Sequence, residues 1–163
     1  MGKINKEKMT AEMEGEFAVF LIGLRINSLW KVHKWLPVSM AMSRMIKELK
    51  QKPELGFMGF ESWFGRTTIM VQYWKSIDHL LDYAQNKNVS HTPAWLNFNE
   101  KIRKSGDVGI WHETYISEKG KYECVYTNMP RFGLGKVGNY VPARDKYHSA
   151  RGRLGRVDKY KGQ

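Results

Sequence analysis

The segment from Phe17 to Asn27, FAVFLIGLRIN, constrains the fold of this chain more than any other stretch. Every even position from Ala18 to Ile26 is apolar, whereas the odd positions begin apolar and finish polar, at Arg25 and Asn27. Alternation with a period of two places one apolar row on one face of a β-strand. The segment is therefore expected to be a strand with a buried face, and a sheet must form around it.

The segments that follow alternate between helical and extended patterns. Pro37 suits the first turn of a helix, so the first helix is expected to start near Trp35 and to end before Pro53. Ser76 is a suitable N-cap for a second helix, and a tight turn at 65–66 predicts a β-hairpin. The expected strands are 17–27, 55–64, 67–74 and 108–117, with a short fifth at 122–127, and the expected helices are 35–50, 77–84 and 93–102.

The resulting order is β-α-β-β-α-β, which predicts an α+β protein with a ferredoxin-like, four-stranded antiparallel sheet. Helices that cover one face of such a sheet leave the other face exposed. Here that second face carries Phe, Trp, Met and Ile, an apolar area too large to remain in water. Two copies that pair these faces across a two-fold axis would cover it, so a homodimer is expected.

Charge divides the chain into three parts. The net charge is +11, and residues 131–163 hold nine Lys or Arg against two Asp, so this part alone carries +7. We expect a flexible N-terminal lead-in at 1–16, a ferredoxin-like domain at 17–130 and a basic C-terminal extension at 131–163. A polyanion is one conceivable partner for the extension, but no RNA- or DNA-reading motif accompanies it, so nucleic acid is not an expected partner.

No membrane partner is expected either, because the longest apolar run, residues 17–24, is too short to span a bilayer. The first sixteen residues have no apolar core of the kind a signal peptide needs. The single cysteine, Cys124, excludes an internal disulfide and fits a reducing compartment. The expected location is cytoplasmic.

Several short motifs resemble those of a known superfamily. Residues 73–76, YWKS, followed by Leu80, Ala84, His91 and Trp95, are similar to a stretch common in the dimeric α/β-barrel, antibiotic-monooxygenase-like superfamily. Segments 15–27, 109–115 and 126–135 resemble one narrower family, the domain of unknown function 4188, whose members are often labelled monooxygenases. The resemblance covers roughly residues 10–140 and implies a dimeric α/β barrel with a cavity between sheet and helices.

The superfamily includes cofactor-free oxygenases, haem-degrading monooxygenases and haem-dependent aldoxime dehydratases. For the haem-degrading branch, the resemblance implies that Asn27, Trp74 and His91 are candidate cofactor residues, with His91 as the iron ligand. His91 lies 17 residues beyond Trp74, further than that branch implies, and it could instead cap the following loop. Trp74 could equally be a core residue.

Four residues are candidates from their own patterns. His112 lies on the otherwise apolar row of the strand 108–117, where it is either a hydrogen-bonded core histidine, a cavity acid or base, or an alternative haem ligand. Arg25 could bind a carboxylate or a haem propionate, or could lie at the solvent-exposed end of the first strand. Asn27 and Trp63 could position a substrate, although each has an ordinary surface or core interpretation.

Three functions follow from these alternatives. The first is a monooxygenase-like enzyme acting on a small molecule, either with haem held by His91 or His112 and by Arg25 and Trp74, or without a cofactor. In the version without a cofactor, His112 is the base and Asn27 or Trp63 positions the substrate. The second is an aldoxime-dehydratase-like lyase that uses haem, and the third is a non-enzymatic module that binds a ligand or a polyanion.

Overall fold

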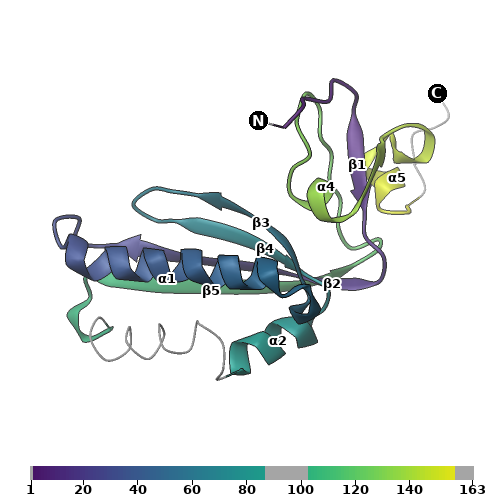
Figure 1. Cartoon of the computed structure of the whole chain (residues 1–163). Coiled ribbons are helices and arrows are strands. Elements are labelled where there is room, and N and C mark those ends of the chain that lie inside the picture. The colour runs from purple at the N-terminus through teal and green to yellow at the C-terminus, as the bar shows by residue number, and fades with distance from the viewer. Residues whose placement is uncertain (1, 87–102, 157–163) are drawn as a thin grey trace. The chain divides into compact units, whose positions relative to one another are not determined.

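A computed structural model describes residues 2–86 and 103–156, and within these ranges the chain forms two compact units. Unit 1 combines the two ends of the chain, residues 1–17 and 116–163, and unit 2 is the continuous segment 18–115. Figure 1 shows the elements of both. The division differs from the boundaries expected at 16/17 and 130/131, because both ends of the chain contribute strands to one small sheet.

Unit 2 is built on four antiparallel strands in the order β3-β4-β2-β5. Their bounds are β2 Glu16–Ile26, β3 Phe57–Trp63, β4 Ile69–Trp74 and β5 Val108–Glu118. Two helices, α1 Val32–Gln51 and α2 Ile77–Gln85, and two short 3-10 turns, η1 Pro53–Leu55 and η2 Arg103–Ser105, complete the described part. This is the mixed α+β, ferredoxin-like strand order that the sequence predicts, with the central strand β2 between β4 and β5. The sheet is open and does not close into a barrel.

One face of the sheet, here called the helix-facing side, forms the core of unit 2. In β2 and β4, Ala18, Met70 and Trp74 point to this side and pack with residues from the two helices. The buried helix residues in this cluster are Ile46, Leu49, Leu80 and Tyr83. The alternation seen in the sequence therefore has the predicted consequence, because the even row of β2 is the row that the helices cover. The opposite face is called the open side.

Helix α1 begins three residues earlier than predicted, so Pro37 lies inside it rather than in its first turn. The reason is tertiary. Lys31 and Lys34, at the start of the helix, both form ion pairs with the carboxylate of Asp107, just before β5. These pairs hold the first turn in place although proline supplies no backbone N–H and no side chain caps the helix.

The hairpin and the second helix follow the prediction closely. Strands β3 and β4 pair from Trp63 and Ile69 at the turn to Phe57 and Trp74, with one irregularity between Phe57 and Gly59. The Ser76 hydroxyl accepts a hydrogen bond from the backbone N–H of His79, so it caps α2 as expected.

Unit 1 has a two-stranded sheet that the sequence analysis did not foresee. Strand β1, Met9–Glu12, pairs antiparallel with β6, Asn139–Pro142. The short helices α4 Leu134–Val137 and α5 Ala150–Arg153 and the 3-10 turn η3 Asp145–Tyr147 surround it. The short fifth strand expected at 122–127 is not a strand, since this segment makes only an isolated bridge from Tyr126 to Met9.

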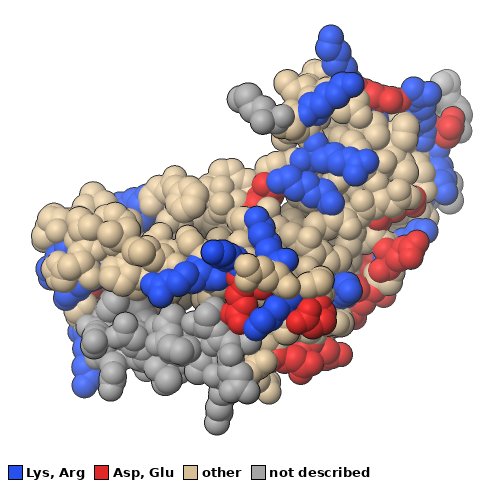
Figure 2. All heavy atoms as spheres, viewed as in Figure 1, with Lys and Arg blue, Asp and Glu red and all other residues tan. Residues whose placement is uncertain are grey.

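The basic residues of the C-terminal part are largely engaged within unit 1. Arg144 pairs with Glu7, Arg153 pairs with Glu123, and Arg131 lies over the ring of Tyr140. Figure 2 shows acidic and basic side chains side by side over this part of the surface rather than an unbroken basic patch. The positive charge of residues 131–156 thus belongs to a folded unit.

Candidate functional site

His112 is the candidate catalytic residue with the clearest setting. It lies in the middle of β5, two positions beyond Ile110 and four beyond the buried Val108, so strand alternation puts its side chain on the helix-facing side. Its ring lies 5.7 Å from the ring of Phe20 on β2, centroid to centroid, and the two rings are tilted by 46°. The side chain of His112 is exposed, so it is open to a molecule from outside.

The surroundings of His112 are apolar. Phe20 and Ile22, both half-buried, pack against the main core of unit 2 on this side. Among the described residues of unit 2, the strands place no other titratable side chain on the helix-facing side. An exposed imidazole at the margin of an apolar surface can take or give a proton beside a bound apolar molecule.

Asn27 and Arg25 lie at the end of β2, away from His112. The backbone N–H of Asn27 donates to the carbonyl of Asp107, five residues before His112 on β5, which is about 16 Å along a strand. The Asn27 amide donates to the carbonyl of Gly106 at 2.9 Å, and Arg25 donates to the Thr67 hydroxyl at 2.7 Å. Both polar groups thus fasten neighbouring loops to the sheet.

The two candidate tryptophans have different environments. Trp74 is fully buried, its rings lie against Phe57 and Tyr83, and its indole N–H donates to the side-chain oxygen of Gln72 at 3.0 Å. Its packing is that of a core residue. Trp63 ends β3 beside the hairpin turn and is 45% exposed. Trp63 pairs with Ile69, so strand alternation puts its side chain, like that of Arg25, on the open side of the sheet and separates both from His112 on the helix-facing side.

A haem held by His112 and Arg25 together does not fit this arrangement. The two residues lie on opposite sides of the sheet, because Arg25 belongs to the odd row of β2 and His112 faces Phe20 of the even row. A single haem cannot have its iron ligated by a residue on one side of the sheet and its propionate bound by a residue on the other side. Trp74 has no face open to a cofactor. His91, the other ligand candidate, lies outside the described residues.

Sequence reasoning missed a charged cluster at the start of α1. The carboxylate of Asp107 is buried and accepts hydrogen bonds from Lys31 at 2.8 Å, from the Ser28 hydroxyl at 2.8 Å and from Lys34. The hydrogen bonds from Lys31 and Lys34 hold the pKa of Asp107 well below its usual range. With every donor aimed at one carboxylate, the cluster ties α1 to the start of β5 and leaves no free group for chemistry.

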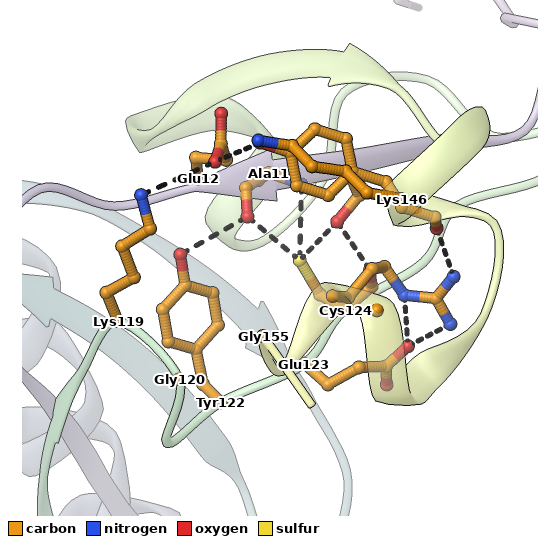
Figure 3. A pocket seen from close by; sticks show the side chains of 13 residues that line it. Ala11, Glu12, Lys119, Gly120, Tyr122, Glu123, Cys124, Lys146 and Gly155 are labelled. Carbon is orange, nitrogen blue, oxygen red and sulfur yellow. Dashed lines mark hydrogen bonds and ion pairs between the residues drawn. The ribbon is translucent and has the colours of Figure 1, made fainter. Parts of the chain in front are cut away.

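Unit 1 contains a pocket of about 120 Å³ that no sequence pattern predicts (Figure 3). Cys124 lies against β1, where its Sγ accepts a hydrogen bond from the backbone N–H of Ala11 at 3.4 Å. The Tyr122 hydroxyl accepts a hydrogen bond from the N–H of Met13, and burial raises the pKa of Tyr122. Other lining side chains are Glu12, Lys119, Lys146 and Tyr147. In the sequence, Cys124 alone pointed to this region, and its thiol contacts the Thr10 hydroxyl and the backbone of Ala11, neither of which is a base.

No three His, Cys, Asp or Glu side chains in residues 2–86 and 103–156 gather closely enough to hold a metal ion. No helix in the same ranges has both the length and the apolar character needed to cross a membrane.

Comparison with known proteins gives a family match. A family model described as "Monooxygenase af470-like" matches residues 17–134. The chain is 26% identical over 132 residues to the protein named monooxygenase af470 from Aspergillus fumigatus. The aligned region covers 76% of this chain and 46% of that protein. The chain thus spans about half the length of this curated relative.

Solved structures show weaker similarity. A protein from Shewanella oneidensis is 12% identical, with 72% of this chain and 97% of that chain covered and a TM-score of 0.41. A protein described as dimeric and ferredoxin-like, from an uncultured marine organism, is also 12% identical, with coverages of 64% and 96% and a TM-score of 0.35. The strand order of unit 2 is by itself that of a ferredoxin-like sheet.

Proposed function

This chain belongs to the Monooxygenase af470-like family, and from that premise we propose that it is a monooxygenase-like enzyme acting on a small, electron-rich organic molecule. The observation that carries the proposal is the position of His112 beside Phe20, exposed and on an apolar surface. In this proposal the substrate lies against Phe20 and Ile22, and His112 is the base.

The chemistry balances without an external reductant. His112 removes a proton from a methylene group that neighbouring aromatic rings acidify, and the resulting carbanion transfers electrons to dioxygen. One oxygen atom becomes the product carbonyl and the other leaves as water, so the methylene carbon supplies all the electrons that reduce dioxygen. The separation of Asn27 and Trp63 from His112 means that neither positions the substrate at the reacting carbon in this proposal.

The haem-dependent alternatives, a haem monooxygenase and an aldoxime-dehydratase-like lyase, receive less support. Their described candidate residues, His112, Arg25 and Trp74, do not share one surface of unit 2. A binding module for polyanions is also less well supported, because several arginines of the C-terminal part are already paired within unit 1.

The test is oxygen uptake by the full chain with a panel of anthrone-like compounds, which carry a methylene group between aromatic rings. We expect substrate-dependent oxygen uptake by the wild type and a loss of at least about 100-fold in His112→Gln, in line with the contribution of a general base. His148→Gln, in unit 1, is the matched control and should retain full activity. Equal activity of His112→Gln and wild type would overturn the role of His112.

We also propose that the chain forms a homodimer through the open side of the sheet, as in the dimeric α/β-barrel superfamily that the motifs resemble. Register pairs Val19 with Tyr73 and Leu21 with Val71 on this side, and all four side chains are only half-buried. Val71→Asp should convert the dimer to a monomer in light scattering, whereas Ser43→Asp, on the exposed face of α1, should not. A wild-type chain that is monomeric at micromolar concentration would contradict the proposal.

A further inference from the structure

At one end of unit 2, several large apolar side chains are exposed to solvent. Trp30, in the loop between β2 and α1, and Phe64, in the turn between β3 and β4, are each 80% exposed. The two loops are neighbours, because the backbone N–H of Ile26 donates to the carbonyl of Arg66 at 2.8 Å. In Figure 1 both loops lie at the same end of the sheet, where α1 begins. Two aromatic rings therefore project from adjacent loops.

The start of α1 extends this apolar surface. Val32, Leu36 and Met40 follow one another at intervals of four residues and are all exposed. At helical spacing they form one exposed stripe along α1, next to the side that buries Ile46 and Leu49. Leu29, next to Trp30, is 53% exposed. We call these six residues the apolar tip: Leu29, Trp30, Val32, Leu36, Met40 and Phe64.

The charges near the apolar tip are almost all positive. Residues 17–47 contain no Asp or Glu but five Lys or Arg, and residues 62–77 contain no acid either. Further along the exposed side of α1, Arg44 and Lys47 follow the apolar stripe. In Figure 2 the surface over the start of α1 is mostly tan with blue at its edge, and blue side chains lie further along. The buried carboxylate of Asp107 is already neutralised by two lysines.

From this combination we propose that the apolar tip docks the chain on the surface of a bilayer that contains anionic lipids. Projecting Trp and Phe side chains beside an amphipathic helix with a basic polar face are the features of proteins that lie in the membrane interface. Anionic headgroups attract the nearby Arg and Lys side chains. Among the described residues no helix can cross a membrane, but binding to the membrane surface does not require such a helix.

A second copy of the chain is a poorer occupant for this surface. Arg44 and Lys47 lie on the same side of α1 as the apolar stripe, so a two-fold contact through this side would bring like charges together. A lipid surface can contact the projecting aromatic rings and the basic side chains Arg44 and Lys47 at the same time. The proposed homodimer uses the open side of the sheet, which is a different surface.

The test is flotation of the full chain with two kinds of vesicle, one of phosphatidylcholine alone and one with about a third phosphatidylserine. The wild type should bind the anionic vesicles, and binding should weaken as salt increases. The double variant Trp30→Ser/Phe64→Ser should weaken binding by about tenfold or more. The reason is that it loses the free energy gained when the two aromatic side chains move from water into the membrane interface. Leu81→Ser, which removes an apolar side chain that is 45% exposed on α2, is the control and should bind as the wild type does.

Charge is tested separately. Arg44→Glu should weaken binding to the anionic vesicles by at least about fivefold, whereas Lys75→Glu, the same charge change after β4, should have little effect. No binding to anionic vesicles, or binding unchanged in Trp30→Ser/Phe64→Ser, overturns the proposal. So does self-association of the wild type that this double variant abolishes, because the tip would then be a contact between copies.

Discussion

The indole nitrogen of Trp111, on β5, lies 2.7 Å from the position that a Cβ atom on Gly23 of β2 would occupy. The same position is 2.0 Å from the carbonyl oxygen of Thr68, which accepts a hydrogen bond from the Trp111 indole at 3.3 Å. Gly23 thus lets the Trp111 side chain cross β2 on the open side and reach the strand beyond it. Packing therefore requires glycine at position 23 of β2.

Substituting Gly23 tests this relationship. Gly23→Ala should lower the free energy of unfolding by about 2 kcal/mol or more, because a backbone carbonyl cannot move aside as a side chain can. Gly109→Ala, on the adjacent strand β5, is the control, since its Cβ would meet nothing closer than 3.7 Å. Urea denaturation measures both, and equal stabilities of the two variants would contradict the packing argument.

Trp74 and Trp30 should respond in opposite ways to truncation. Trp74→Ala removes a fully buried side chain from the core and should cost about 3–5 kcal/mol. Trp30→Ala removes a side chain that is 80% exposed and should change stability by less than about 0.5 kcal/mol. Thermal unfolding of both variants checks the difference, and a large loss in Trp30→Ala would show that its ring supports the fold.

Asp107 should make the protein sensitive to acid. Hydrogen bonds from Lys31 and Lys34 lower the pKa of Asp107 in the folded state, so its stabilising effect is complete above the ordinary carboxyl pKa of about 4. That effect is lost as the pH falls below this value towards the folded-state pKa. Asp107→Asn should lower the melting temperature at pH 7 and flatten its decrease below pH 4.

The control for this prediction is Asp82→Asn, which removes an exposed carboxylate on α2. It should leave the acid dependence of the melting temperature as in the wild type. A melting curve of Asp107→Asn that shifts with acid as strongly as that of the wild type would rule out the proposed linkage.

Arg153 should be important for unit 1. Its guanidinium group donates to the Glu123 carboxylate at 2.6 Å and to the carbonyls of Tyr147 and His148 at 2.8 and 3.0 Å. Arg153→Met removes the donor from the Glu123 carboxylate and the Tyr147 carbonyl, whereas the His148 carbonyl still accepts from Lys8, and the expected cost is about 1–3 kcal/mol. Amide hydrogen exchange should therefore become faster in η3 and α5, whereas Arg151→Met, at an exposed position, should not change it.

The sequence predicts unit 2 better than unit 1 for a physical reason. The alternation of β2, the apolar row of β5 and the cap at Ser76 are local patterns, and each reappears in the structure. Strands β1 and β6 have four residues each and pair across most of the chain, with Met9 opposite Pro142. Such short strands carry too little periodicity to be recognised, and their pairing depends on contacts distant in sequence.

The same distinction applies to the candidate site. The sequence places His112 on an apolar row, but it cannot show that Phe20 is the neighbouring ring. It groups Asn27 with His112 as catalytic candidates, whereas the pairing of β2 with the loop before β5 puts five residues of strand between them. Asp107 has its partners 73 to 79 residues earlier in the chain, a separation at which no local pattern exists.

The central claim is that His112 starts a monooxygenation, and labelled dioxygen tests it most directly. A compound that supports oxygen uptake is incubated with the protein under oxygen-18 gas, and the mass of the product is measured by mass spectrometry. We predict one labelled oxygen atom in the product carbonyl, and no labelled product above background with His112→Gln. An unlabelled product, or labelled product formed equally well by His112→Gln, would contradict the account.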